Sequence, residues 1–208
     1  MGKDRSTYHR NEAEEKEPKE ERAFDFDELE GESEVFEIIK RHRSVTDYHV
    51  YLSENVESNF QYVKLLDTLR TAGPHDTVTM YLANYGGICS TGFQIVNAMK
   101  QCKAGVDVIV DAPCYSMAAI LAVSGKSMTM NPGTFLMFHN YSGGDQGKGK
   151  ERLDATMHFY EHFHKHLKTI AAPFLTAKEL NMLRKDQDIY IDYDDKDLQK
   201  RITRHWRK

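Results

Sequence analysis

The chain has 208 residues, of which 40% are apolar, so it can build one substantial hydrophobic core but hardly two. No apolar run approaches the roughly 18 to 20 residues that a membrane-spanning helix needs, and the acidic N-terminus does not read as a secretory signal. The three cysteines form no CxxC pair, which is typical of reduced thiols. Together these features predict a cytoplasmic protein without a membrane partner.

Charge is unevenly distributed along the chain. Residues 1–34 hold 13 Asp/Glu and 6 Lys/Arg, which leaves 22 basic and 19 acidic residues in the remainder. The first segment has no apolar periodicity, so we expect 1–34 to be an acidic, disordered tail and 35–208 to form one domain. A domain this close to neutral gives no indication of nucleic-acid binding.

Strands and helices are predicted to alternate along this domain. We expect strands at 48–52, 77–82, 106–110 and 135–138, and helices at 58–72, 91–102, 116–123 and 151–172. Repeating units of about 30 residues predict an α/β fold with parallel strands. The segment from 188 to 206 is charged and gives no clear pattern.

Three of the predicted strands are followed by residues suited to chemistry, and in α/β folds the sites lie beyond such carboxyl ends. These residues are Gly86-Gly87, Ser116 and His139. A serine that attacks an amide needs a base for its proton and donors for the oxyanion. His139 is the candidate base, and the backbone N–H groups of Met117 and Gly87 are the candidate donors.

Each residue also has an ordinary interpretation. Ser116 could be a helix N-cap, and His139 could be a histidine in a satisfied pocket at a strand end. The pair His158 and His162 resembles a zinc motif on a helix, but no third ligand is evident, so we expect no metal.

The three motifs together resemble the ClpP family of self-compartmentalising serine proteases, in the order and with nearly the spacing of that family. They are Asn84-Tyr85-Gly86-Gly87 with Gly92, Cys114-Tyr115-Ser116-Met117-Ala118-Ala119 with Gly125, and Pro132 followed by 135–138, His139-Asn140-Tyr141 and Gly143-Gly144. The resemblance covers roughly residues 45–192. Asn84-Tyr85 replaces the Asn-Ser-Pro run of the family and Ala112-Pro113 replaces a glycine, so the chain reads as a divergent member, of a type common in bacteriophage genomes.

The resemblance implies a fold, a triad and an assembly. The fold is the ClpP/crotonase-like repeated ββα superhelix, with a protruding handle helix within about 143–173. The triad is Ser116, His139 and Asp188, with Asp186 as the second candidate for the acid, and it works through an acyl-enzyme without any cofactor. Polypeptides are the substrates, and subunits form a homo-oligomeric ring that a separate ATP-driven unfoldase often feeds.

The handle helix carries an apolar stripe, which we expect to need a partner subunit, and four histidines that would lie at that interface. The stripe is Phe159, Tyr160, Phe163 and Leu167, and the histidines are His158, His162, His164 and His166.

Two alternatives to the peptidase remain. One is a crotonase-type acyl-CoA hydratase or isomerase with a carboxylate base, and the other is a catalytically inactive structural ring subunit.

Overall fold

A four-stranded parallel sheet forms the centre of the chain. The computed structural model describes residues 44–143 and 148–206, so the acidic segment 1–34 lies outside the described residues. The sheet has the order β1-β2-β3-β5, formed by β1 (Asp47–Leu52), β2 (Thr77–Leu82), β3 (Asp107–Val110) and β5 (Ser127–Met130). Its pairs are in parallel register, for example Leu52 with Leu82 and Val110 with Met130. The expected parallel α/β arrangement is confirmed, and β5 is a strand that the sequence pattern did not predict.

A second, smaller sheet carries the residues of interest. It has the order β4-β6-β7, with β4 (Cys114–Tyr115) parallel to β6 (Phe135–Phe138) and β7 (Ile189–Asp192) antiparallel to it. In β6 the side chains alternate between half-buried and buried, because one face packs on the core and the other faces outward. The predicted strand 135–138 therefore has its expected bounds. Its antiparallel neighbour, β7, lies in the segment 188–206, for which the sequence gave no clear pattern.

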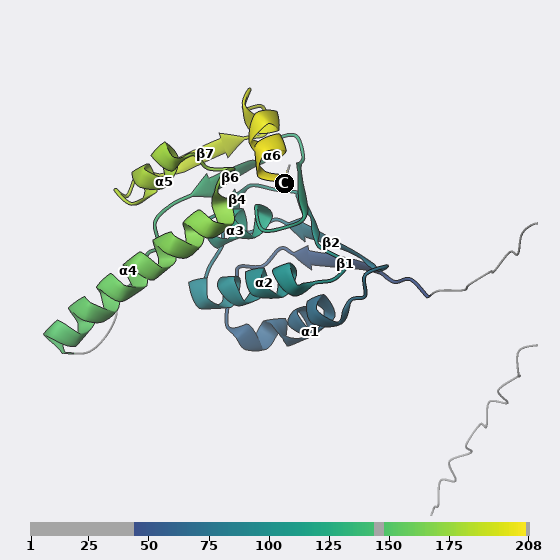
Figure 1. The fold of residues 1–208 in the computed structure, drawn as a ribbon, viewed down its shortest axis with the longest axis horizontal. Coiled ribbons are helices and arrows are strands. Elements are labelled where there is room, and N and C mark those ends of the chain that lie inside the picture. The colour runs from purple at the N-terminus through teal and green to yellow at the C-terminus, as the bar shows by residue number, and fades with distance from the viewer. Residues whose placement is uncertain (1–43, 144–147, 207–208) are drawn as a thin grey trace, which may run out of the picture. The chain divides into compact units, whose positions relative to one another are not determined.

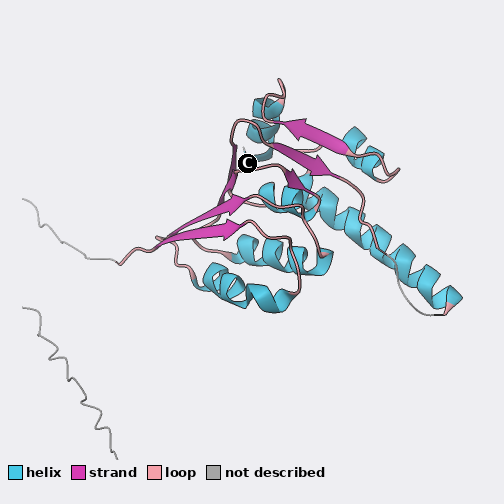
Figure 2. Cartoon of the chain, turned by 180° about the vertical axis from the view of Figure 1, so that it is seen from behind, coloured by secondary structure: helices cyan, strands magenta, loops and turns pink. Residues whose placement is uncertain are grey.

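Helices cover the first sheet and connect it to the second. The 3-10 turn Asn59–Tyr62 leads into α1 (Val63–Thr71), which packs beside α2 (Cys89–Gln101) (Figure 1). Helix α3 (Met117–Ala122) is buried at all six positions and contacts α2, β4 and β6. Figure 2 shows the same arrangement from behind, with both sheets in magenta. This buried helix fixes the position of Ser116, which lies directly between β4 and α3 in the chain.

Helix α4 (Gly149–Ala171) extends away from the body of the chain, as expected for a handle (Figure 1). The expectation that its apolar stripe needs a partner is wrong for its C-terminal half, because Phe163 and Leu167 are buried within their own chain. His164 is also buried, at 5% exposure, so it is not available to an interface. The exposed apolar side chains lie nearer the tip, where Leu153 is 62% and Met157 is 53% exposed.

The C-terminal segment is held by polar contacts between two helices. Helix α5 (Ala177–Leu183) begins with a capping box, in which Thr176 and Glu179 bond each other's backbone N–H groups. Arg201 of α6 (Leu198–Trp206) makes two hydrogen bonds with the Glu179 carboxylate, at 3.0 and 2.7 Å. None of the helices in the described part of the chain is long and apolar enough to span a membrane.

Candidate active site

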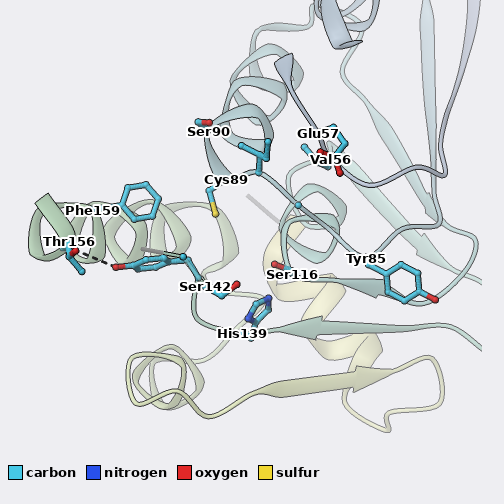
Figure 3. Close-up of a pocket in the computed structure, with 14 residues that line it drawn as sticks. Val56, Glu57, Tyr85, Cys89, Ser90, Ser116, His139, Ser142, Thr156 and Phe159 are labelled. Carbon is cyan, nitrogen blue, oxygen red and sulfur yellow. Dashed lines mark hydrogen bonds between the residues drawn. The ribbon is translucent and has the colours of Figure 1, made fainter. Parts of the chain in front are cut away.

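A cavity of about 720 Å³ opens where β2, β4 and β6 end. Ser116, His139 and Gly87 line it together with an apolar group that includes Tyr141 and Phe159. In Figure 3 the side chains of Ser116 and His139 lie next to one another in the cavity, with Thr156 and Phe159 to one side and Tyr85 to the other. The structure therefore brings together the serine and the histidine that the sequence predicts as nucleophile and base.

Ser116 occupies a sharp turn between β4 and α3. Its backbone has φ 54° and ψ −121°, a region that non-glycine residues rarely enter and that costs conformational energy. The turn is fixed because the Ser116 N–H donates to the carbonyl oxygen of Met137 at 2.7 Å. Although Ser116 stands at the N-cap position, its side chain makes no capping hydrogen bond. The hydroxyl therefore faces the cavity, and the strand-to-helix turn is of the kind that exposes serine nucleophiles.

The Gly86-Gly87 turn lies directly against this serine. A Cβ atom at Gly86 would lie only 2.7 Å from both the Met117 nitrogen and the Cβ of Ser116, so the close approach requires glycine. Gly86 also has φ 89°, which favours the same residue. The turn and the start of α3 therefore share one small space beside the Ser116 hydroxyl.

Hydrogen bonds from an isolated β-bridge residue, Val56, hold the turn in place. The Val56 N–H donates to Gly86 O at 2.6 Å and the Ile88 N–H donates to Val56 O at 2.7 Å, which makes Val56 and Gly87 a parallel bridge. In such a bridge the N–H of the central residue points away from the partner. The N–H groups of Gly87 and Met117, the latter the first residue of α3, make no hydrogen bond within the described part of the chain. Gly87 lines the cavity, and the Met117 N–H directly follows Ser116 at the start of α3.

His139 and Asp188 lie at facing ends of β6 and β7. The last pair in the antiparallel register is Phe138 with Ile189. His139 directly follows Phe138 and Asp188 directly precedes Ile189, so both residues adjoin the same end of this strand pair. Asp186, the second candidate, is bound elsewhere, because its Oδ1 accepts a 2.7 Å hydrogen bond from the Asn140 amide.

The three side chains are not yet joined by hydrogen bonds. Within residues 44–143 and 148–206, no hydrogen bond links His139 to Ser116 or to Asp188. Catalytic hydrogen bonds are often long in unliganded enzymes and shorten when substrate binds, so this geometry is compatible with a triad.

One end of the cavity carries two aromatic rings. Tyr141 packs edge-on against Phe159, with ring centroids 4.7 Å apart, and its hydroxyl donates to the Thr156 carbonyl oxygen at 3.4 Å. Cys89 also lines the cavity. Burial raises the pKa of the Cys89 thiol, which keeps it protonated at neutral pH and makes it a weak nucleophile. This end is suited to an apolar side chain of a ligand rather than to chemistry.

Sequence reasoning did not predict the roles of two residues near the site. Asn84 was noted only as part of a motif, but it is 2% exposed, and its amide joins Leu52 O to the Gly86 N–H, which fixes the glycine turn. Val56 gave no signal, because its role depends on pairing with a segment about 30 positions away.

The exposed histidines of α4 do not form a metal site. His158 and His162 stack with centroids 6.2 Å apart, and among the described residues no group of three His, Cys, Asp or Glu side chains is arranged to hold a metal ion.

A model of the Clp protease family matches residues 30–194, which include both sheets, α4 and every element of the cavity. The chain belongs to the Clp protease family. The mixed α/β architecture with its parallel sheet is that of this family, and membership makes the chain a ClpP-like peptidase at the level of the family. The Clp protease family generally acts on polypeptides and forms oligomers.

Proposed function

We propose that this Clp protease family member is a serine endopeptidase in which Ser116 is the nucleophile, His139 the base and Asp188 the acid that orients it. The observation that carries the proposal is the conformation of Ser116. The residue is held at φ 54° in a strand-to-helix turn, its hydroxyl does not cap the helix, and it faces the cavity beside His139. Backbone strain of this kind persists where function requires it.

The reaction follows from the groups around Ser116. Its Oγ attacks the carbonyl carbon of the scissile peptide bond while His139 takes the hydroxyl proton. The carbonyl oxygen becomes negative and accepts hydrogen bonds from the N–H groups of Gly87 and Met117. The C–N bond then breaks, and His139 gives its proton to the leaving amine. Water attacks the resulting ester, with His139 moving the proton again, and this step releases the acid product and restores Ser116.

The register of β6 and β7 supports Asp188 as the acid rather than Asp186. Asp188 directly precedes Ile189, whose strand partner Phe138 directly precedes His139, whereas Asp186 already accepts the Asn140 amide. A carboxylate opposite the imidazole holds it in the tautomer that accepts the serine proton.

Assembly into a homo-oligomeric ring is the second part of the proposal. The tip of α4 supports it, because Leu153 and Met157 are exposed on a helix that extends away from the body. Isolated apolar side chains are common on surfaces, but two on one protruding helix favour a contact with another subunit. Enclosure in a ring would restrict the sites to polypeptides that are already unfolded, which a separate ATP-driven unfoldase would deliver.

Cleavage assays separate the peptidase from the two alternatives. A hydratase of the crotonase type would depend on a carboxylate, and Glu57 is the carboxylate among the residues that line the cavity. The purified protein should cleave an unfolded protein and short peptides, and Ser116→Ala should abolish cleavage while Glu57→Gln retains it. Hydration of an enoyl thioester that survives Ser116→Ala would favour the hydratase. Absence of any cleavage by the assembled wild-type protein would favour the structural subunit.

A further inference from the structure

Four aromatic side chains, three of them from the second sheet, form a partly exposed row next to the candidate active site. We define the aromatic row as Tyr85, Tyr115, Phe135 and Tyr190. Successive ring centroids are 5.1, 5.1 and 6.0 Å apart. Tyr85 is 71% and Tyr190 is 55% exposed, and the two rings between them are half-buried. The row is therefore a continuous aromatic surface rather than a set of scattered apolar residues.

Strand geometry places the row on the same face as His139. Side chains alternate along β6, so Phe135, Met137 and His139 share one face while Leu136 and Phe138 point into the core. The register pairs Met137 with both Tyr115 and Tyr190, which brings the neighbouring strands to that face as well. A ligand that lies along this face passes from the row to the catalytic histidine without crossing a strand.

The row also begins at the cavity itself. Tyr85 lines the cavity and Tyr115 directly precedes Ser116. In Figure 3, Tyr85 lies on the opposite side of Ser116 from Thr156 and Phe159. Two apolar surfaces thus flank the serine, namely the Phe159 end of the cavity on one side and the aromatic row on the other.

We propose that the aromatic row binds apolar or aromatic side chains of the polypeptide substrate, on the side of the scissile bond away from the Phe159 end of the cavity. This inference rests on the proposed peptidase function. The occupant is argued from continuity, because Tyr85 lines the cavity that holds Ser116, on the side opposite Thr156 and Phe159, and so connects the row to the site of a bound peptide. Tyrosine and phenylalanine rings bury large apolar areas at low cost in side-chain entropy, which suits them to a sequence-tolerant platform.

The charges beside the row narrow the class of substrate. Asp192 pairs with Phe135 on the same face, and Asp188 directly precedes the strand that carries Tyr190. Both carboxylates would repel an acidic side chain in the substrate. We therefore expect the row to favour phenylalanine over alanine and to disfavour aspartate.

Peptide cleavage with matched variants tests the row. The substrates are peptides that differ only in having Phe, Ala or Asp at the two to four positions on each side of the cleaved bond, with cleavage sites read by mass spectrometry. Tyr190→Thr should lower kcat/KM for the Phe peptides about three- to tenfold, mainly through KM, and lower it much less for the Ala peptides. Tyr190→Phe should retain the preference, because the ring remains. Tyr51→Thr is the control, since Tyr51 is 70% exposed but belongs to the first sheet.

Each outcome decides the proposal. If Tyr190→Thr lowered kcat/KM equally for Phe and Ala peptides, or for neither, the proposed role of the aromatic row would be wrong, while the proposed peptidase function would stand. A Tyr190→Thr variant with unchanged Phe preference but a lower mass in light scattering would identify the row as a contact between copies of the chain and would also overturn the proposal. If the wild-type protein cleaves no peptide at all, the proposed peptidase function is wrong, and so is the proposal that the row binds its substrate.

Discussion

The backbone N–H of Gly86 donates a 2.9 Å hydrogen bond to Asn84 Oδ1, while Asn84 Nδ2 donates to Leu52 O at 2.8 Å. One buried amide therefore connects the end of β1 to the glycine turn that touches Ser116. Asn84 does not reach the cavity itself, so its role is to position the turn and, through it, the N–H of Gly87.

We predict that Asn84→Asp lowers kcat more than it changes KM. The substitution keeps the acceptor for Gly86 but loses the donor, and it sets a buried carboxylate against Leu52 O, at a cost of about 1–3 kcal/mol. Steady-state kinetics and thermal unfolding measure both effects. Asn55→Asp is the matched control, because exposed Asn55 uses only its Oδ1 to accept the Tyr85 N–H, and it should change little. Equal losses in the two variants would argue against a positioning role.

We predict that Asp188→Asn lowers kcat by roughly two to four orders of magnitude, because the imidazole loses the group that orients it. Asp186→Asn should have a small effect. Asparagine tolerates the φ of 56° at that position and can still accept the Asn140 amide. Measuring kcat for both variants with a peptide at saturating concentration makes the comparison. Small and equal losses would mean that Ser116 and His139 work as a dyad.

We predict that the protein has a mass many times 24.0 kDa by light scattering at neutral pH. Leu153→Glu with Met157→Glu should reduce that mass, because both side chains are exposed on the handle and would become charged in a contact. Mild acidification should act in the same direction, because burial and the nearby His162 lower the pKa of half-buried His166, so that a positive charge on this side chain is unfavourable where α4 is packed. A monodisperse, active monomer at neutral pH would contradict the assembly.

We predict that acid weakens the contact between α5 and α6. Burial acts to raise the pKa of Glu179, but hydrogen bonds from Arg201 and from the N–H and hydroxyl of Thr176 outweigh it and lower the pKa to about 2. Because the folded pKa lies below the ordinary value of 4.5, the contact stabilises the fold above pH 4.5. Its contribution, on the order of 2 kcal/mol, is lost as the pH falls from there towards 2.

Acid unfolding of Glu179→Gln checks this prediction. The variant should be less stable than the wild type at pH 7, and the difference should disappear near pH 2. Asp197→Asn, which removes the exposed pair with Lys200, is the control and should change the free energy of unfolding only slightly. A difference for Glu179→Gln that does not depend on pH would contradict the assigned ion pair.

Much of the fold could be predicted because its strands and helices carry strong local patterns. The strands at 77–82 and 135–138 have their predicted bounds, since they are apolar, rich in β-branched or aromatic residues and bounded by turn residues. Strand β4 has only two residues, and β7 and α6 lie in a charged segment, so local pattern could not reveal them. Their formation depends on pairing and packing with distant parts of the chain.

The candidate site was predictable to the extent that it lies at strand ends. Ser116, His139 and Gly87 follow three predicted strands, and the fold brings them to one cavity. The register that pairs Phe138 with Ile189, next to His139 and Asp188, joins segments about 50 positions apart, so only the family resemblance indicated this aspartate in the sequence. Asn84 and Val56 act through hydrogen bonds whose partners no local pattern identifies.

The most direct test of the central claim is to label the protein with a fluorophosphonate and locate the adduct by mass spectrometry. We predict a single adduct on Ser116 that disappears in His139→Ala, because the hydroxyl is nucleophilic only when the histidine takes its proton. The thiol of Cys89, whose pKa is raised by burial, should react only slowly with iodoacetamide at neutral pH. An adduct on another cavity serine, such as Ser90 or Ser142, or labelling of Ser116 that persists without His139, would contradict the account.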